Sequence, residues 1–169
     1  MAKHIFMKFE GGTTKIDGES RDANHKGWIE IDSWGHSIRQ PSSATASSSG
    51  GLTAERCEHG EMVFTKEIDL TSPSLWQVCS QGEVFKTVTI EFFRASNTEP
   101  IKYLEIVLHN AMVGSVAPSV VGEGLPTETV SLKYASVKWT YTKQDLDHNV
   151  TGNNPKMWSL AQNKATEAV

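Results

Sequence analysis

Apolar and polar residues alternate most regularly along residues 86–92. Val88, Ile90 and Phe92 fall on one face of an extended chain, and Thr87, Thr89 and Glu91 fall on the other. This period of two predicts a β-strand with one buried face. Residues 102–109 repeat the pattern, with Leu104, Ile106 and Leu108 on one face and Tyr103, Glu105, Val107 and His109 on the other. Ser, Asn and Pro at residues 96–100 predict a turn between the two strands.

A third alternating run, residues 130–141, changes phase part-way. Val130 and Leu132 mark the apolar face before Ala135, and Val137 and Trp139 mark it afterwards, displaced by one residue. A shift of one residue turns every later side chain to the opposite face. We therefore expect either a β-bulge there or a strand that crosses from one sheet to another, as in barrels and sandwiches with sharp corners.

Shorter patterns complete the expected elements. Residues 5–9 and 28–31 look like strands, and the polar stretch at residues 17–26 looks like a connection. A helix is expected over residues 72–82, with Ser72 as its N-cap, worth about 1 kcal/mol, followed by Pro73 at the first position and ended by Gly82.

Two segments lack the pattern of a packed element. Residues 40–51 are almost entirely Pro, Ser, Ala, Thr and Gly, and residues 114–127 contain two Pro and three Gly. Exposed loops of this length are often functional, so both are candidate contact arms. Flexible connection without a binding role is the alternative.

The composition narrows the function further. The 169 residues suit one domain, and a net charge of -4 without a basic stripe argues against nucleic-acid binding and membrane anchoring. No apolar segment resembles a signal peptide, so synthesis and folding are expected in the cytoplasm. Cys57 and Cys79 lack metal-site spacing and are expected to be reduced packing residues.

The sequence offers no recognisable catalytic, cofactor-binding or metal-binding motif. His25, His36, His59 and His148 lack ligand partners at zinc-like spacing. The neighbours Cys57, Glu58 and His59 contain a nucleophile and a base, but adjacent strand residues point to opposite faces. A calcium-loop match beginning at Asp145 fails at Val150 and Lys156. We expect no enzyme activity and no cofactor.

Several ordered motifs carry a resemblance to a known family. The central one is Phe64-Thr65-Lys66-x-Ile68-Asp69-x-x-x-Pro73-x-Leu75, continuing to Cys79-Ser80-x-Gly82. Around it lie Phe6-x-Lys8, Gly18-Glu19-Ser20, Trp34-Gly35, Tyr103-Leu104-x-Ile106-x-Leu108 and Thr127-Glu128-x-Val130-x-Leu132. In order and spacing, over nearly the whole chain, these motifs resemble the Hcp (haemolysin-coregulated protein) family of bacterial type VI secretion systems.

The resemblance implies a fold and an assembly. It implies a mainly β protein, a compact β-barrel of two packed sheets with one short α-helix, forming a homohexameric ring. Rings would stack as the inner tube, contact spike and sheath or baseplate components, and carry small effector proteins in the lumen. The protein would be cytoplasmic before firing and then secreted without a cleaved signal peptide. Residues 1–169 would form a single Hcp-like domain with no appended effector domain.

Site residues follow from the same resemblance. The loop at residues 40–55 would contact a neighbouring ring or subunit, and the candidates in it are Gln40, Pro41, Ser42, Ser43, Ser47, Gly50, Leu52 and Glu55. Ser33, before the Trp34-Gly35 pair, would lie near the lumen wall. The alternative is a β-sandwich module that binds a peptide or carbohydrate on an aromatic platform of Trp28, Trp34 and Trp139. A Ser or Cys hydrolase assembled from distant residues is a third class.

Overall fold

The structure, a computed structural model, describes residues 4–41, 55–96, 99–145 and 149–169. Along these residues the elements follow in the order β1 Ile5–Glu10, β2 Ile29–Glu30, β3 Ser33–Gly35, β4 Ile38–Arg39, β5 Glu58–His59, β6 Met62–Glu67, α1 Ser72–Gln81, β7 Val84–Arg94, β8 Ile101–Ser119, β9 Thr127–Lys133, β10 Ser136–Gln144 and β11 Val150–Ser159. The strands expected at residues 5–9, 86–92 and 102–109 are confirmed, and that at 28–31 is shorter than expected.

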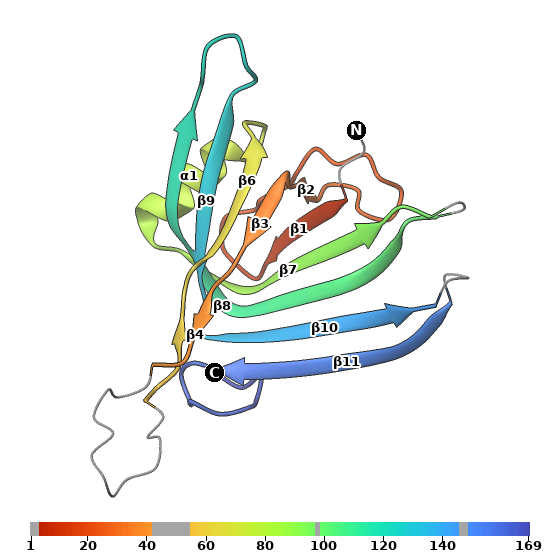
Figure 1. Ribbon diagram of the computed structural model, residues 1–169. Helices are drawn as coiled ribbons and strands as arrows, with labels where there is room; N and C mark the ends of the chain where they lie inside the picture. Colours follow the sequence, from red (N-terminus) through yellow and green to blue (C-terminus); the bar gives the residue numbers. More distant parts are fainter. Residues whose placement is uncertain (1–3, 42–54, 97–98, 146–148) are drawn as a thin grey trace, which may run out of the picture.

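Most strands belong to one antiparallel sheet that folds over on itself. Its order is β2-β1-β7-β8-β9-β6-β3, with β10 attached to β8 and β11 to β10, while β4 and β5 form a separate ribbon. Figure 1 shows β3, β6 and β9 rising steeply in the view, whereas β7, β10 and β11 run nearly across it. The two layers enclose the core, so the predicted β-barrel of two packed sheets with one short helix is confirmed.

The alternating runs bury the faces that the sequence predicts. β7 and β8 pair so that Val88 lies opposite Leu108 and Ile90 opposite Ile106, and all four side chains are fully buried. Burying side chains of this size contributes about 1.5–3 kcal/mol each. The same two strands hold Thr87, Thr89 and Glu91 on the opposite face, next to Val107 and Glu105.

The phase change near Ala135 marks a corner of the barrel. Lys133 pairs with Met112 and Ser136 with His109, so the pairs are three residues apart on both strands and no residue is inserted. A bulge at that point is therefore excluded. The buried positions of β8 shift at the same level, from Leu108 to Ala111, and Asn110 between them has a φ of 47°. Asn adopts this left-handed conformation more readily than most residues, and both strands change face together.

The helix ends as expected but begins differently. Gly82 has a φ of 65° and terminates the helix in the left-handed conformation. Thr71, not Ser72, occupies the N-cap position, and no side chain caps the helix there. The Ser72 hydroxyl is buried and donates to Glu128 Oε1 at 2.6 Å instead. The prediction of Ser72 as N-cap is wrong because the Ser72 hydroxyl oxygen accepts instead from the Asp69 amide at 3.0 Å and from Lys66 Nζ at 3.2 Å.

Two other expectations need correction. The loop expected at residues 114–127 is shorter, because β8 continues to Ser119 and pairs with β9, where Ser119 lies opposite Thr127. Pro118 is tolerated since β7 ends its pairing with β8 at Met112 and leaves this stretch with one paired edge. The strand β11 was not expected, because residues 152–155 read Gly-Asn-Asn-Pro. Among the described residues, no helix is long and apolar enough to cross a membrane.

Candidate functional site

The described part of the predicted contact loop closes at its base. Gln40 Nε2 donates to the carbonyl oxygens of Pro41 at 3.1 Å and Glu55 at 2.5 Å, and the Glu55 amide donates to Pro41 at 3.3 Å. These three residues stand where the β4–β5 ribbon leads into the loop. The other candidates, Ser42, Ser43, Ser47, Gly50 and Leu52, lie outside the described residues. Their contact role stays a prediction.

Ser33 lies on the edge strand β3. Its hydroxyl is 2.6 Å from Thr65 Oγ1 on β6, and the residue is exposed. Two small hydroxyl groups thus lie at this end of the β3–β6 pairing, in place of bulky side chains. That geometry suits a smooth polar wall, and the lumen position of Ser33 stays a prediction.

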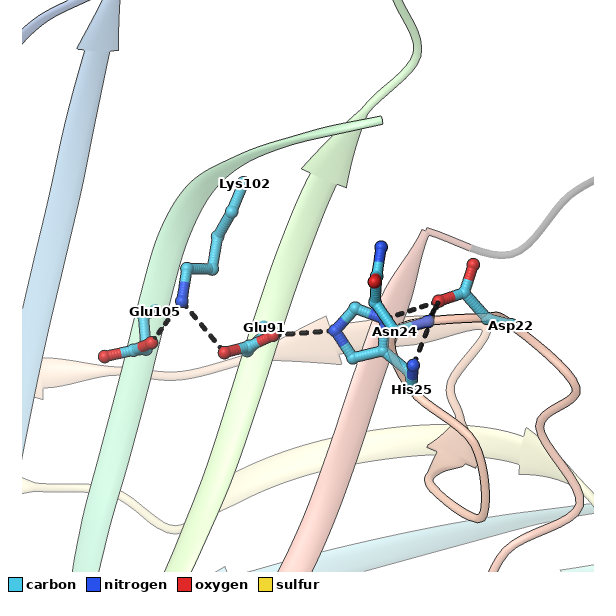
Figure 2. A network of polar contacts seen from close by, with 6 residues as sticks. All are labelled: Asp22, Asn24, His25, Glu91, Lys102 and Glu105. Carbon is cyan, nitrogen blue, oxygen red and sulfur yellow. Dashed lines mark hydrogen bonds and ion pairs between the residues drawn. The ribbon is translucent and has the colours of Figure 1, made fainter. Parts of the chain in front are cut away.

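A polar network on the outer sheet face joins residues that are distant in sequence (Figure 2). His25 lies between two carboxylates, with Nδ1 2.7 Å from Asp22 Oδ1 and Nε2 2.7 Å from Glu91 Oε2. Lys102 Nζ lies 2.9 Å from Glu91 Oε1 and 2.5 Å from Glu105 Oε2. The network therefore ties the polar connection at residues 17–26 to β7 and β8.

The register explains why the network needs Lys102 between its carboxylates. Glu91 and Glu105 are direct cross-strand partners, and like charges opposite each other destabilise a sheet. Burial alone would raise the pKa of Glu91, but hydrogen bonds from Lys102 and His25 outweigh it and lower that pKa. Burial opposes the charge of Lys102, yet Glu105 and Glu91 raise its pKa. The hydrogen bond from His25 lowers the pKa of Asp22.

The same connection is fixed from its other end by a close backbone approach. Gly18 donates its amide to the Gly27 carbonyl at 2.7 Å, and a Cβ at Gly18 would lie 2.1 Å from the Trp28 carbonyl oxygen. Only glycine fits there. Sequence reasoning missed the network because His25 looked like a loop residue, and its partner Glu91 is 66 positions away.

A second, buried cluster joins helix α1 to the barrel. Lys66 Nζ lies 2.8 Å from Glu128 Oε1 and 2.7 Å from Asp69 Oδ1, and the side chains of Lys66 and Glu128 are fully buried. Trp76 Nε1 of the helix donates to Glu128 Oε2 at 2.8 Å. The motif residues Lys66 and Asp69 thus have a structural role: they hold the start of the helix on β6 and β9. None of the described His, Cys, Asp and Glu residues gather in threes to hold a metal ion.

Comparison with known proteins decides the family. The profile described as "Type VI secretion system effector, Hcp" matches residues 6–141 of this chain. The chain belongs to the Hcp family. It is 32% identical over 165 residues to Protein hcp1 of Pseudomonas aeruginosa, covering 96% of this chain and 98% of that protein. The predicted identity as a type VI secretion tube protein is thereby confirmed.

Solved structures agree with the Hcp assignment. One described as a type six secretion system protein superposes with a TM-score of 0.87 at 27% identity, covering 98% of this chain and 100% of that one. Hcp1 of Salmonella typhimurium superposes with a TM-score of 0.77 at 31% identity, with coverages of 98% and 100%. Hcp is a family of structural tube proteins.

The aromatic platform of the alternative function is not assembled in this Hcp protein. Trp28 packs against the His25 ring at the β1 edge, with centroids 5.0 Å apart. Trp34 packs against Phe92 at 5.3 Å, and Trp139 against His59 at 6.2 Å. Trp34 and Trp139 both border the His36 and His59 rings, whereas Trp28 packs separately against His25, so the three do not form one platform.

One exposed apolar group stands out instead. Val120, Val121 and Leu125 at the tip of the β8–β9 hairpin are 65%, 79% and 70% exposed. We call these three residues the hairpin tip. Figure 1 shows the hairpin projecting beyond the rest of the barrel. Grouped exposed apolar side chains mark protein interaction sites, so one of the two suspected contact arms ends in an apolar tip.

Proposed function

We propose that copies of this protein close into hexameric rings, which stack into the inner tube of a type VI secretion system. The observation that carries this proposal is the match over 98% of the chain and all of the type six secretion system structure, at a TM-score of 0.87. A subunit of the same shape can occupy the same place in an assembly.

A ring and a tube place different demands on one surface. A ring closes when one patch binds a different patch on the next copy, and stacking requires a second heterologous contact that does not close. The hairpin tip is our candidate for the lateral contact, because it projects apolar side chains that a neighbour can bury. The loop based at Gln40, Pro41 and Glu55 is our candidate for stacking.

The remaining surface is the face of β7 and β8 that points away from the core. It carries Thr87, Thr89 and Val107 beside the Glu91–Lys102–Glu105 network. A face of hydroxyl groups and internally paired charges resists tight burial, so we assign it, with Ser33, to the lumen wall. Small effector proteins would travel there, and spike and baseplate or sheath components would bind at the ends and outside of the tube.

The remaining expectations complete the proposal. Residues 1–169 act as one structural domain, without enzyme activity, a cofactor or nucleic-acid binding. The protein folds in the cytoplasm and is exported through the secretion system without a cleaved signal peptide. Esterase and peptidase probes test the absence of a hydrolase, because a Ser or Cys nucleophile would be labelled.

Imaging tests the assembly directly. Purified protein should give six-fold rings in negative-stain electron micrographs and a mass of six subunits by native mass spectrometry. A protein that stays monomeric at high concentration contradicts the ring and tube proposal.

A further inference from the structure

The β4–β5 ribbon joins the barrel through an irregular junction. Gly35 pairs with Val63 at the end of the β3–β6 ladder, and Ile38 pairs with His59 at the start of the ribbon. Between these two pairs the chain has two residues on one side, 36 and 37, and three on the other, 60–62. The Gly60 amide donates to the Ser37 carbonyl at 2.9 Å and bridges the gap. Ladders are weakest at such bulges, so side chains must help to hold the ribbon in place.

A cluster of three rings provides that hold. The Tyr134 hydroxyl lies 2.6 Å from His36 Nε2 and 3.4 Å from His59 Nδ1. Tyr134 stands at the barrel corner between β9 and β10, whereas His36 lies in the connection that leads into β4 and His59 is the last residue of β5. The His36 and His59 ring centroids are 6.1 Å apart. One phenol thus connects both strands of the ribbon to the barrel.

The hydrogen bonds of this cluster require at least one neutral imidazole. A hydroxyl has one proton to donate, and a neutral imidazole has one donor and one acceptor nitrogen. Tyr134 can therefore donate to one histidine and accept from the other. Burial raises the pKa of Tyr134, which keeps the phenol protonated. If both histidines are protonated, all their ring nitrogens are donors and the phenol proton has no acceptor among them.

The surroundings also disfavour protonation. Burial lowers the pKa of His36, repulsion from His59 lowers it further, and only a hydrogen bond at Gly60 opposes this. Burial lowers the pKa of His59 as well. A folded-state pKa below the ordinary 6.5 means that the contact is stable above that pH and is lost as the pH falls through the lowered values.

Neighbouring groups do not supply a compensating negative charge. Glu61 pairs with Lys133 at 3.5 Å and accepts the Ser131 hydroxyl, and Glu58 pairs with Arg39 at 3.1 Å. Two more neighbours bind backbone carbonyls, Cys57 that of Arg39 and Arg56 that of Leu160. The Trp34 ring lies tilted beside His36, with centroids 6.3 Å apart, and the Trp139 ring is stacked on His59 with centroids 6.2 Å apart. Both carboxylates beside the cluster, Glu58 and Glu61, are therefore already paired.

We propose that His36, Tyr134 and His59 form a pH-sensitive anchor, which holds the β4–β5 ribbon on the barrel at neutral pH and releases it in mild acid. Release of the ribbon is a property of the single subunit and does not require the ring or the tube. Its consequence for stacking rests on the proposed tube function, because the ribbon leads into the predicted contact loop.

Hydrogen exchange of the full chain, corrected for intrinsic rates, tests the anchor at about pH 7.5 and about pH 5.5, on either side of the histidine range. Protection at residues 36–41 and 55–61 should fall in acid by about tenfold for each pKa unit of linked shift. Protection on β7 and β8 should stay constant. Unchanged protection of the ribbon across this range overturns the proposal.

Variants assign the effect to the cluster. The double variant His36→Gln and His59→Gln keeps neutral hydrogen-bonding groups and should lose the pH response. His4→Gln, at the start of β1, is the matched control and should keep it. Tyr134→Phe keeps the ring but removes the hydroxyl, so the ribbon should exchange fast already at neutral pH. A full pH response in the double variant or in Tyr134→Phe contradicts the anchor.

Tube length at the two pH values separates the two proposals. Ribbon release without any change in tube length supports the anchor and counts against a stacking role for the loop. Shorter tubes in acid with constant ribbon protection overturn the anchor and leave the tube proposal intact.

Discussion

At the scale of single residues, Glu83 organises the segment after β1. Its carboxylate accepts hydrogen bonds from the amides and hydroxyls of both Thr13 and Thr14, at 2.5–2.9 Å. Led by the bonds from Thr14, these contacts lower the pKa of Glu83 to about 2. A Cβ at Gly12 would lie 2.5 Å from the Phe85 ring, so the chain needs glycine for this approach. One carboxylate thus fixes this loop through four donors.

Replacing Glu83 by Gln should loosen this loop in a pH-dependent way. The contribution of Glu83 is present above the ordinary pKa of 4.5 and is lost as the pH falls toward about 2. The difference in Tm between wild type and Glu83→Gln should therefore be largest at neutral pH and shrink in acid. Glu10→Gln, which removes only an exposed pair with Lys8, is the control. Equal Tm values at neutral pH would argue against this role.

Lys66, by contrast, is a charged residue whose side chain is fully buried. Lys66→Met should destabilise the fold by about 3–5 kcal/mol, because it leaves the buried Glu128 carboxylate without its cation. Lys133→Met removes an exposed lysine paired with Glu61 and should cost less than about 1 kcal/mol. Denaturant unfolding measures both. Similar losses for the two variants would show that the buried pair is not important for stability.

At the scale of elements, the hairpin tip is exposed without being needed for the core. Val121→Glu should leave the Tm of the subunit nearly unchanged and reduce ring formation, because a charge at an apolar contact must be desolvated. Val150→Glu makes the same change at a similarly exposed valine on β11 and is the matched control. Native mass spectrometry compares the hexamer fractions. Equal hexamer fractions for the two variants would indicate that the lateral contact lies on another surface.

Elements with two faces of different polarity were the ones that the sequence predicted well. β7 and the first half of β8 alternate because one face is buried along their length. The strand β11 escaped prediction because most of its residues are exposed, and its register comes from β10, where Pro155 lies opposite Thr140. Local composition cannot reveal a strand that a neighbour specifies.

The candidate site shows the same limit. The family motif located Lys66, but its burial against Glu128 depends on a β6–β9 pairing across 62 positions. Likewise, no pattern in the sequence pairs His36 with His59, and the fold places Tyr134 between them. Polar clusters formed by residues far apart in the sequence depend on the fold. Residue patterns and motif spacing therefore could not predict them.

At the scale of the whole molecule, ring formation and stacking should be separable. Deleting residues 42–49 removes much of the predicted contact loop but keeps Gln40, Pro41 and Glu55, which close its base. The barrel and the hairpin tip are untouched, so rings should persist while tubes shorten and secretion falls. A variant with residues 42–49 replaced by eight Gly and Ser residues keeps the length and tests side-chain identity. Since a heterologous stacking contact does not close, losing part of it shortens every tube. Unchanged tube length and secretion in the deletion variant would exclude this segment from the stacking contact.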